Sequence, residues 1–94
     1  MPFPEQSPRI FNWFSVENLS PNQFGVYGLF RAGTWIYIGS GDIRKRLLDH
    51  LNGDNPCIMR ERPTHWMDVV TANMDEKEKE LILEFNPICN QRVG

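Results

Sequence analysis

Two stretches rich in aromatic and branched residues, 24–30 and 35–38, are separated by the segment Arg31-Ala32-Gly33-Thr34. This arrangement is typical of a β-hairpin. A third stretch, Thr64 to Thr71, has the tryptophan and valine content of a strand. The hydrophobic pattern therefore predicts a hairpin near the start of the chain and one further strand.

The hairpin carries the only two tyrosines of the chain, Tyr27 and Tyr37. With a three-residue loop centred on Ala32, Tyr27 would lie opposite Tyr37, because cross-strand partners share one face of a sheet. Gly25 and Gly39 would lie on that same face and leave it bare, so that the backbone of a ligand can approach closely. Paired tyrosines are also ordinary sheet packing, and this alternative stays open.

Apolar residues at helical spacing predict three helices, at 43–51, 56–62 and 75–85. Asp42 is a good cap for the first helix, and Asn52-Gly53 ends it. A helix between two strands indicates a crossover connection. The predicted fold class is therefore α+β, a small sandwich in which helices flank a three-stranded sheet made of the antiparallel hairpin and the third strand.

Residues 1–22 have a different character, with apolar residues spread among four of the seven prolines, Pro2, Pro4, Pro8 and Pro21. Proline at this density prevents a long helix, and the apolar content argues against a free tail. We expect an N-terminal arm, 1–22, packed by its aromatic residues on a domain formed by 23–94. Trp13 and Phe14 are expected to pack within the protein rather than to stack on bases.

Composition limits the function. The 94 residues suit one small domain, and the net charge of −2 argues against a protein that binds polyanions over its whole surface, although a local basic groove remains compatible. Cys57 and Cys89 match no zinc-binding spacing with His50 or His65 and are expected to be reduced thiols. With no signal peptide and no apolar run near 18 residues, we expect a cytoplasmic protein.

Arg46 and His50 lie four residues apart on the first predicted helix, so they point the same way. They flank its apolar stripe, which places them near the seam between helix and sheet. A solvated charged surface is the alternative, and it is the better explanation for Arg44, Lys45 and Arg46 taken as a cluster.

Glu78 precedes Leu81, Ile82 and Phe85 by three, four and seven residues, so it belongs to the inward stripe of the last helix. A carboxylate on an inward face is costly unless it is paired or binds a cation. The spacing Asp75-x-x-Glu78 is equally that of a capping box, in which Glu78 folds back to the start of its helix.

Taken together, these residues resemble the GIY-YIG nuclease superfamily. Five elements occur in the order that the family shows: Gly25-Val26-Tyr27, Tyr37-Ile38-Gly39, Arg46 with His50, Glu78, and Pro87 with Asn90. The segment from Tyr37 to the arginine is about one residue shorter than in the family, which leaves Arg44 as a second candidate for the helix-borne arginine. His50, four residues after Arg46, favours Arg46.

The resemblance implies a divalent-metal-dependent endonuclease that hydrolyses DNA phosphodiester bonds by a one-metal mechanism. One Mg²⁺ or Mn²⁺ would be held by Glu78, waters and a phosphate oxygen, because a single strong carboxylate does not suit a two-metal site. Asn90 would orient either its loop or Glu78. The expected catalytic residues are Tyr27, Tyr37, Arg46, His50 and Glu78.

The expected partner is DNA, bound through residues that reach phosphates: Ser40, Gly41, Arg44, Lys45, Arg60 and Arg62. With no recognition domain in the chain, a homodimer or a separate targeting partner would have to supply strong sequence preference. The alternative function is a catalytically silent DNA- or protein-binding module on the same fold.

Overall fold

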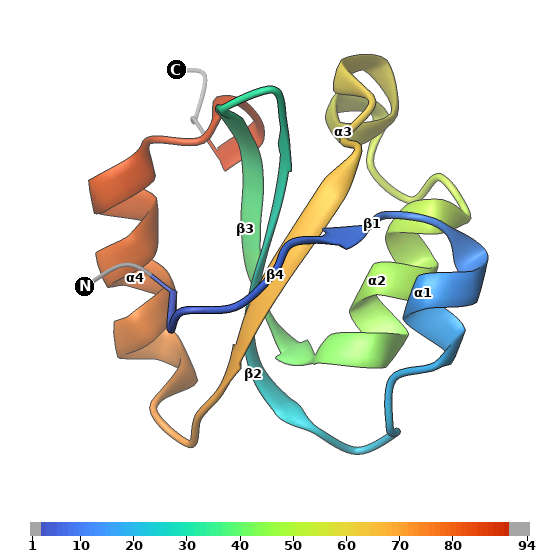
Figure 1. Ribbon diagram of the computed structural model, residues 1–94. Helices are drawn as coiled ribbons and strands as arrows, with labels where there is room; N and C mark the ends of the chain where they lie inside the picture. Colours follow the sequence, from blue (N-terminus) through green and yellow to red (C-terminus); the bar gives the residue numbers. More distant parts are fainter. Residues whose placement is uncertain (1–2, 91–94) are drawn as a thin grey trace.

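The computed structural model describes residues 3–90 and shows one antiparallel sheet of four strands in the order β1-β4-β2-β3 (Figure 1). The α+β class is confirmed, but the predicted number of three strands is wrong. The additional strand is β1 in the N-terminal segment, where Arg9 pairs with Trp66 and Ile10 with His65. The strands are β1 (Arg9–Ile10), β2 (Phe24–Arg31), β3 (Thr34–Asp42) and β4 (His65–Val70).

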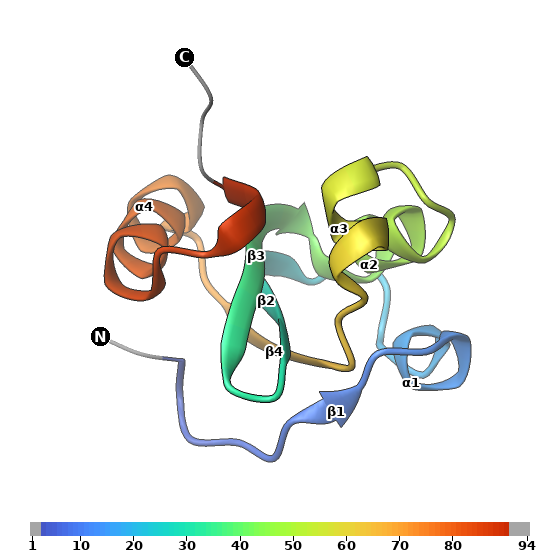
Figure 2. The same ribbon diagram turned by 90° about the horizontal axis from the view of Figure 1, so that it is seen from above.

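Helices cover both faces of this sheet (Figure 2), so that α1, α2 and α3 lie on one side and α4 on the other. The helices are α1 (Trp13–Glu17), α2 (Ile43–Leu51), α3 (Pro56–Glu61), α4 (Met74–Phe85) and the 3₁₀ turn η1 (Ile88–Asn90). Strands β3 and β4 both run antiparallel to β2, which lies between them. The predicted crossover connection is therefore confirmed, with α2 and α3 forming it.

Local capping explains why α2 and α3 form where the sequence predicts them. The Asp42 side chain accepts a hydrogen bond from the backbone N–H of Lys45, and Gly53 follows the helix with a φ of +85°. Asn55 caps α3 in the same way, accepting from the N–H groups of Cys57 and Ile58.

The predicted register of the hairpin is wrong by two residues. Tyr27 lies opposite Gly39, and Tyr37 lies opposite Leu29, with a β-bulge directly after Leu29. The turn consists of Ala32 and Gly33 alone, with φ values of +48° and +80°, and two positive φ angles suit the twist of a two-residue hairpin turn. Because the side-chain period of a strand is two, both tyrosines still project from the same face.

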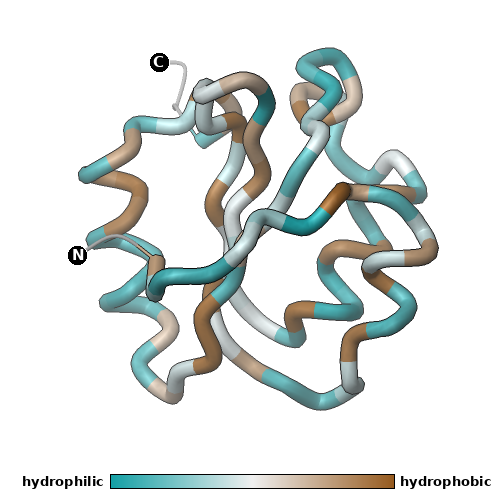
Figure 3. The backbone as a smooth tube through the Cα atoms, viewed as in Figure 1, coloured by the Kyte–Doolittle hydropathy of each residue, from teal (hydrophilic) through white to brown (hydrophobic). Residues whose placement is uncertain are grey.

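The two faces of the sheet carry separate cores. One core packs between the sheet and α1, α2 and α3 and contains Val16, Tyr27, Leu29, Ile43, Leu47, Ile58 and Trp66. The other packs between the sheet and α4 and contains Phe3, Val26, Ile38 and Leu81. Figure 3 shows hydrophobic stretches along the central strands and on the side of α4 that faces them.

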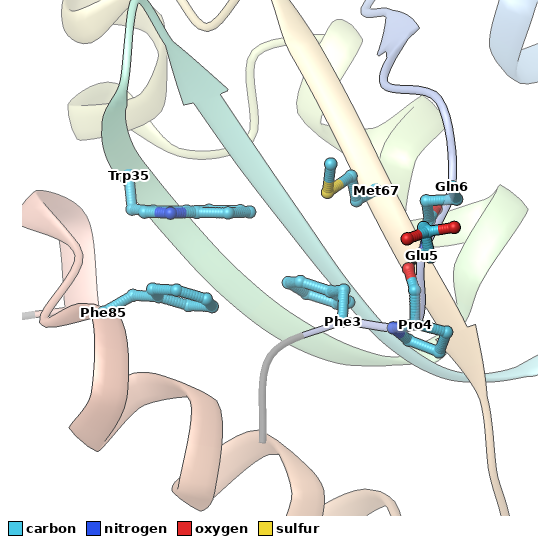
Figure 4. Close-up of a pocket in the computed structure, with 7 residues that line it drawn as sticks. All are labelled: Phe3, Pro4, Glu5, Gln6, Trp35, Met67 and Phe85. Atoms are coloured by element: carbon cyan, nitrogen blue, oxygen red, sulfur yellow. Dashed lines mark hydrogen bonds between the residues drawn. The ribbon is translucent and has the colours of Figure 1, made fainter.

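The N-terminal segment contacts both sides of the sheet. Phe3 stacks against Trp35 and Phe85 at the border of a cavity of about 320 Å³ (Figure 4), and Val16 is buried in the other core. Trp13 and Phe14, however, are 45% and 78% exposed, so the expectation that they pack inside is wrong. The cause is the shortness of α1, whose single buried residue is Val16. Residues 1–2, with Pro2, and 91–94 lie outside the described residues.

Cys57 and Cys89 form a disulfide that joins α3 to η1, with their Cα atoms 5.7 Å apart. The expectation of two reduced thiols is therefore wrong. The pairing needs residues 32 apart in sequence to be brought together by the fold, and their spacing alone did not reveal it. The disulfide also removes one of the reasons for expecting a cytoplasmic location.

Between residues 3 and 90, no helix is long and apolar enough to cross a membrane.

Candidate active site

The candidate site is built around β3, which forms one edge of the sheet. The rings of Tyr27 and Tyr37 lie 6.3 Å apart on the side that faces α2. Tyr27 is completely buried, whereas Tyr37 is partly exposed. A Cβ atom at Gly39 would collide with the Tyr27 phenol. The expected bare patch is therefore absent at Gly39, because the Tyr27 side chain fills the space that the glycine leaves.

His50 on α2 connects the Tyr27 phenol to a carboxylate. The Tyr27 hydroxyl lies 2.7 Å from Nε2 of His50, and Nδ1 of His50 lies 2.8 Å from Oδ1 of Asp54. Burial lowers the pKa of His50, although its hydrogen bond to the Asp54 carboxylate opposes this shift. The imidazole is therefore neutral at neutral pH, so that one of its two ring nitrogens carries a proton and the other can accept a hydrogen bond.

Burial also raises the pKa values of the two phenols, Tyr27 and Tyr37. It raises the pKa of Tyr27 far above the ordinary value, and the neighbouring Tyr37 raises it further, while Arg46 opposes the shift. Burial likewise raises the pKa of Tyr37. Both side chains are therefore neutral hydroxyls at neutral pH, and neither is a phenolate base.

Arg46 is the arginine that interacts with both phenols, since its positive charge lowers the pKa of Tyr27 and of Tyr37 against the effect of burial. Its Nη1 atom lies 3.4 Å from a carboxylate oxygen of Asp49 and 4.0 Å from one of Asp54. The guanidinium is thus held beside the tyrosines by two acidic side chains.

Glu78 approaches β3 from the opposite side, on α4. Its Oε1 atom accepts a hydrogen bond of 3.0 Å from the hydroxyl of Ser40. The capping-box alternative is wrong, because Asn73 occupies the cap position and α4 has no side-chain cap bond. Burial is the main cause of the raised pKa of Tyr37, and the negative charge of Glu78 raises that pKa further. The carboxylate is therefore close enough to the phenol to interact with it electrostatically.

Asn90 is attached to β3 rather than to Glu78. Its side-chain amide donates to the carbonyl of Ile38 at 2.9 Å and accepts from the N–H of Ile38 at 2.7 Å. These two bonds satisfy the backbone N–H and carbonyl groups of Ile38 on the edge strand. The hollow between Asn90 and α4 has a volume of about 510 Å³ and is lined by Asp75, Glu78, Lys79, Ile82 and Asn90.

Two of the basic residues that the sequence assigns to DNA binding, Lys45 and Arg60, have local acidic partners. Lys45 lies 3.9 Å from the Asp49 carboxylate, and Arg60 on α3 lies 3.5 Å from that of Glu61. Arg62 ends α3 with a left-handed backbone. Gly41, which precedes α2, has a φ of +125°, a conformation that suits glycine.

The donor set fits a single hard cation. Within residues 3–90 there is no group of three histidine, cysteine or acidic side chains able to hold a metal ion. Glu78 supplies one carboxylate beside an open polar hollow, and only its Oε1 atom accepts from Ser40. Mg²⁺ commonly keeps several waters and takes one or two protein carboxylates together with substrate phosphates, so the Glu78 carboxylate is chemically suited to such an ion.

Asp54 is the site residue that the sequence analysis missed. The only local signal for it is its position four residues after His50, beyond the end of α2. That spacing implies a contact only while the helix continues. Asp54 contacts His50 because the loop after α2 turns back toward the helix, and the sequence alone does not show this turn.

Neither a family model nor a curated protein matches this chain. Among solved structures, the chain is similar to the GIY-YIG N-terminal endonuclease domain of UvrC from Thermotoga maritima, a tyrosine-to-phenylalanine mutant bound to its catalytic divalent cation. The two are 31% identical with a TM-score of 0.67, and the match covers 79% of this chain and 89% of that one. This similarity supports a nuclease-type function. The chain belongs to the GIY-YIG superfamily.

Proposed function

We propose that this protein is a divalent-metal-dependent endonuclease that hydrolyses DNA phosphodiester bonds with one metal ion. The observation that supports the proposal is that two phenols and the Arg46 guanidinium lie together on one side of β3, while the Glu78 carboxylate contacts Ser40 of the same strand from the other side. The similar domain of UvrC is an endonuclease bound to a catalytic divalent cation, which agrees with this assignment.

The attacking water is oriented by Tyr27, which is fully buried in this structure and therefore has to become accessible to water when DNA binds. The Tyr27 hydroxyl lies 2.7 Å from His50 Nε2, and when it donates its proton to that atom its oxygen presents lone pairs to a water molecule. As the water attacks, its proton passes to the Tyr27 oxygen while the Tyr27 proton passes to His50. The raised pKa of Tyr27 makes a free phenolate a poor alternative at neutral pH, so the imidazole is the final acceptor. Tyr37 hydrogen-bonds within the same site.

Arg46 binds the phosphate that is cleaved. Its planar guanidinium matches two phosphate oxygens, and it stays charged at any working pH. Charge builds up on those oxygens in the transition state, so a cation that the fold already holds in place lowers the barrier.

Glu78 holds the metal ion, for which Mg²⁺ and Mn²⁺ are the candidates. When bound, the ion neutralises charge on the phosphate and assists departure of the 3′ oxygen. The Ser40 hydroxyl orients the Glu78 carboxylate toward the hollow beside α4. Asn90 acts indirectly, by securing the C-terminal turn to β3 at Ile38.

DNA runs over the amino end of α2, where Arg44 and Lys45 lie, and over α3, which carries Arg60 and Arg62 at the other end of α2 (Figure 1). The backbone amides of Ser40 and Gly41 and the side chains of Arg44, Lys45, Arg60 and Arg62 contact phosphates. Because the chain has a net charge of −2, this local surface has to supply the attraction, and binding should weaken steeply with salt. A second copy of the chain or a separate targeting partner provides sequence preference.

The test is nicking of supercoiled plasmid by purified protein with Mg²⁺, with Mn²⁺ and with a chelator. Glu78→Gln keeps the shape of the side chain and removes its charge, so nicking should fall by about 100-fold or more, the scale of losing one electrostatic contact to a transition state. Glu76→Gln, an exposed position on the same helix, is the matched control and should nick like the wild type.

Equal nicking by wild type and Glu78→Gln would show that the site is misplaced. Binding of DNA without cleavage, in both Mg²⁺ and Mn²⁺, would favour the alternative of a silent binding module. Circular dichroism and thermal unfolding of each variant separate loss of activity from loss of fold.

A further inference from the structure

Asp54 lies in the loop after α2, three residues beyond the end of the helix, yet its carboxylate returns to the site. Gly53, with a φ of +85°, turns the chain, and the N–H of Asp54 donates to the carbonyl of Asp49 at 3.2 Å. One carboxylate oxygen lies 2.8 Å from His50 Nδ1, and the other lies 4.0 Å from Arg46 Nη1.

We propose that Asp54 is a positioning residue that keeps the proton of His50 on Nδ1, so that Nε2 is the atom that takes the proton of Tyr27. The inference rests on the proposed nuclease function and deepens it, because it assigns the direction of proton movement within that site.

The geometry gives the imidazole two fixed neighbours. His50 is only 3% exposed, and each ring nitrogen faces one oxygen, that of Tyr27 or that of Asp54. An ionised carboxylate accepts hydrogen bonds and cannot donate them, so Nδ1 must carry the proton. Nε2 then has a free lone pair, and the Tyr27 hydroxyl supplies the proton that matches it. If Nε2 of His50 also carried a proton, the buried Tyr27 hydroxyl could not donate to it, and the Tyr27 O–H would lose this partner.

With this tautomer of His50, every bond and proton in the hydrolysis can be followed. The water oxygen forms a bond to phosphorus, the bond from phosphorus to O3′ breaks, and the electron pair leaves with O3′, which takes a proton from solvent. The water proton goes to Tyr27, and the Tyr27 proton goes to His50 Nε2. The resulting imidazolium is stabilised by the Asp54 carboxylate, which does not itself become protonated.

Asp54→Asn tests the assignment with almost no change of shape. The new amide donates a hydrogen bond to Nδ1, which favours the opposite tautomer with the proton on Nε2, and that atom then cannot accept from Tyr27. We expect kcat for nicking to fall by roughly 100-fold or more with little change in KM, as for other carboxylates that set a histidine tautomer. Asp54→Glu, which keeps an acceptor-only group, should retain more activity than Asp54→Asn.

Asp49→Asn is the matched control. Asp49 also contacts Arg46, at 3.4 Å, but His50 Nδ1 bonds to Asp54. A loss caused only by the changed environment of Arg46 would therefore be at least as large in Asp49→Asn. We expect the loss in Asp54→Asn to exceed it by 10-fold or more.

A second measurement needs neither metal nor DNA. The ¹⁵N chemical shifts of the His50 ring distinguish the two tautomers, and a His65→Gln variant assigns the signals, since the chain has only two histidines. We expect the proton on Nδ1 in the wild type and on Nε2 in Asp54→Asn. The same spectra show whether each variant is folded.

A wild-type proton on Nε2, or an Asp54→Asn variant that nicks like Asp49→Asn, would overturn this inference while leaving the nuclease function intact. If the expected tautomer change is seen but the wild type nicks no DNA under any metal condition, the proposed nuclease function is overturned and the relay with it.

Discussion

The disulfide between Cys57 and Cys89 should stabilise the folded protein, and this prediction depends on the fold alone. It joins the first turn of α3 to η1 and encloses a loop with a sequence separation of 32 residues. We consider its removal by the double substitution Cys57→Ser with Cys89→Ser, which keeps the size of both side chains close to the original. The same bond is removed reversibly by adding a reductant to the wild type.

The expected loss of stability follows from the length of the loop. In the chain-entropy description, opening a loop of this size raises the entropy of the unfolded chain enough to destabilise the fold by about 3.7 kcal/mol at 25 °C. Small domains are stable by about 5–15 kcal/mol, so the change is a large part of the total. The domain should remain folded at 25 °C but unfold at a much lower urea concentration.

Urea unfolding followed by circular dichroism measures this change, with and without reductant. The double variant serves as the control, because reductant should leave its midpoint unchanged. Amide hydrogen exchange adds a local measurement: the N–H of Ile38 donates to Asn90, which directly follows Cys89, so its protection should fall when η1 is released.

Unfolding midpoints that are identical with and without reductant would refute the reasoning, as would free thiols in protein purified without reductant. Either result would mean that the two cysteines are not bonded in solution. Removing the cysteines would then not destabilise the fold, and η1 would not be covalently attached to α3.

Two further predictions concern the site. Gly39→Ala should destabilise the protein by about 1–3 kcal/mol, measured by urea unfolding, because the added methyl group must displace the Tyr27 phenol; an unchanged midpoint would show that the phenol does not lie over Gly39. Nicking should decline as pH falls through the pKa of His50, which burial lowers below its ordinary value despite Asp54, because a protonated imidazole cannot accept from Tyr27; a rate that rises with acidity would contradict the relay.

Much of the secondary structure could be predicted because its causes are local. The side chain of Asp42 caps the helix that starts next to it, and Asn55-Pro56 does the same for α3. Asn86 ends α4 one residue before Pro87. In each case the interacting groups are within four residues of each other, so the sequence contains the whole interaction.

The hairpin register and β1 could not be predicted in the same way. The register depends on a bulge after Leu29 and on Ala32 adopting a positive φ, which alanine does only when the surrounding sheet imposes it. Strand β1 has only two residues, Arg9 and Ile10, and exists because β4 offers an edge on which to pair.

The candidate site shows the same difference between what local sequence predicts and what the fold decides. By itself the sequence determined the inventory, namely two phenols, one helix-borne arginine with a histidine one turn later, and an inward glutamate, together with the family resemblance that the comparison confirmed. Only the tertiary structure decided what these groups touch. Whether Glu78 caps its own helix or faces Ser40 depends on a hydroxyl 38 residues away, and the partner of His50 depends on a loop turn. The local sequence around Glu78 allows both arrangements, so long-range packing chooses between them.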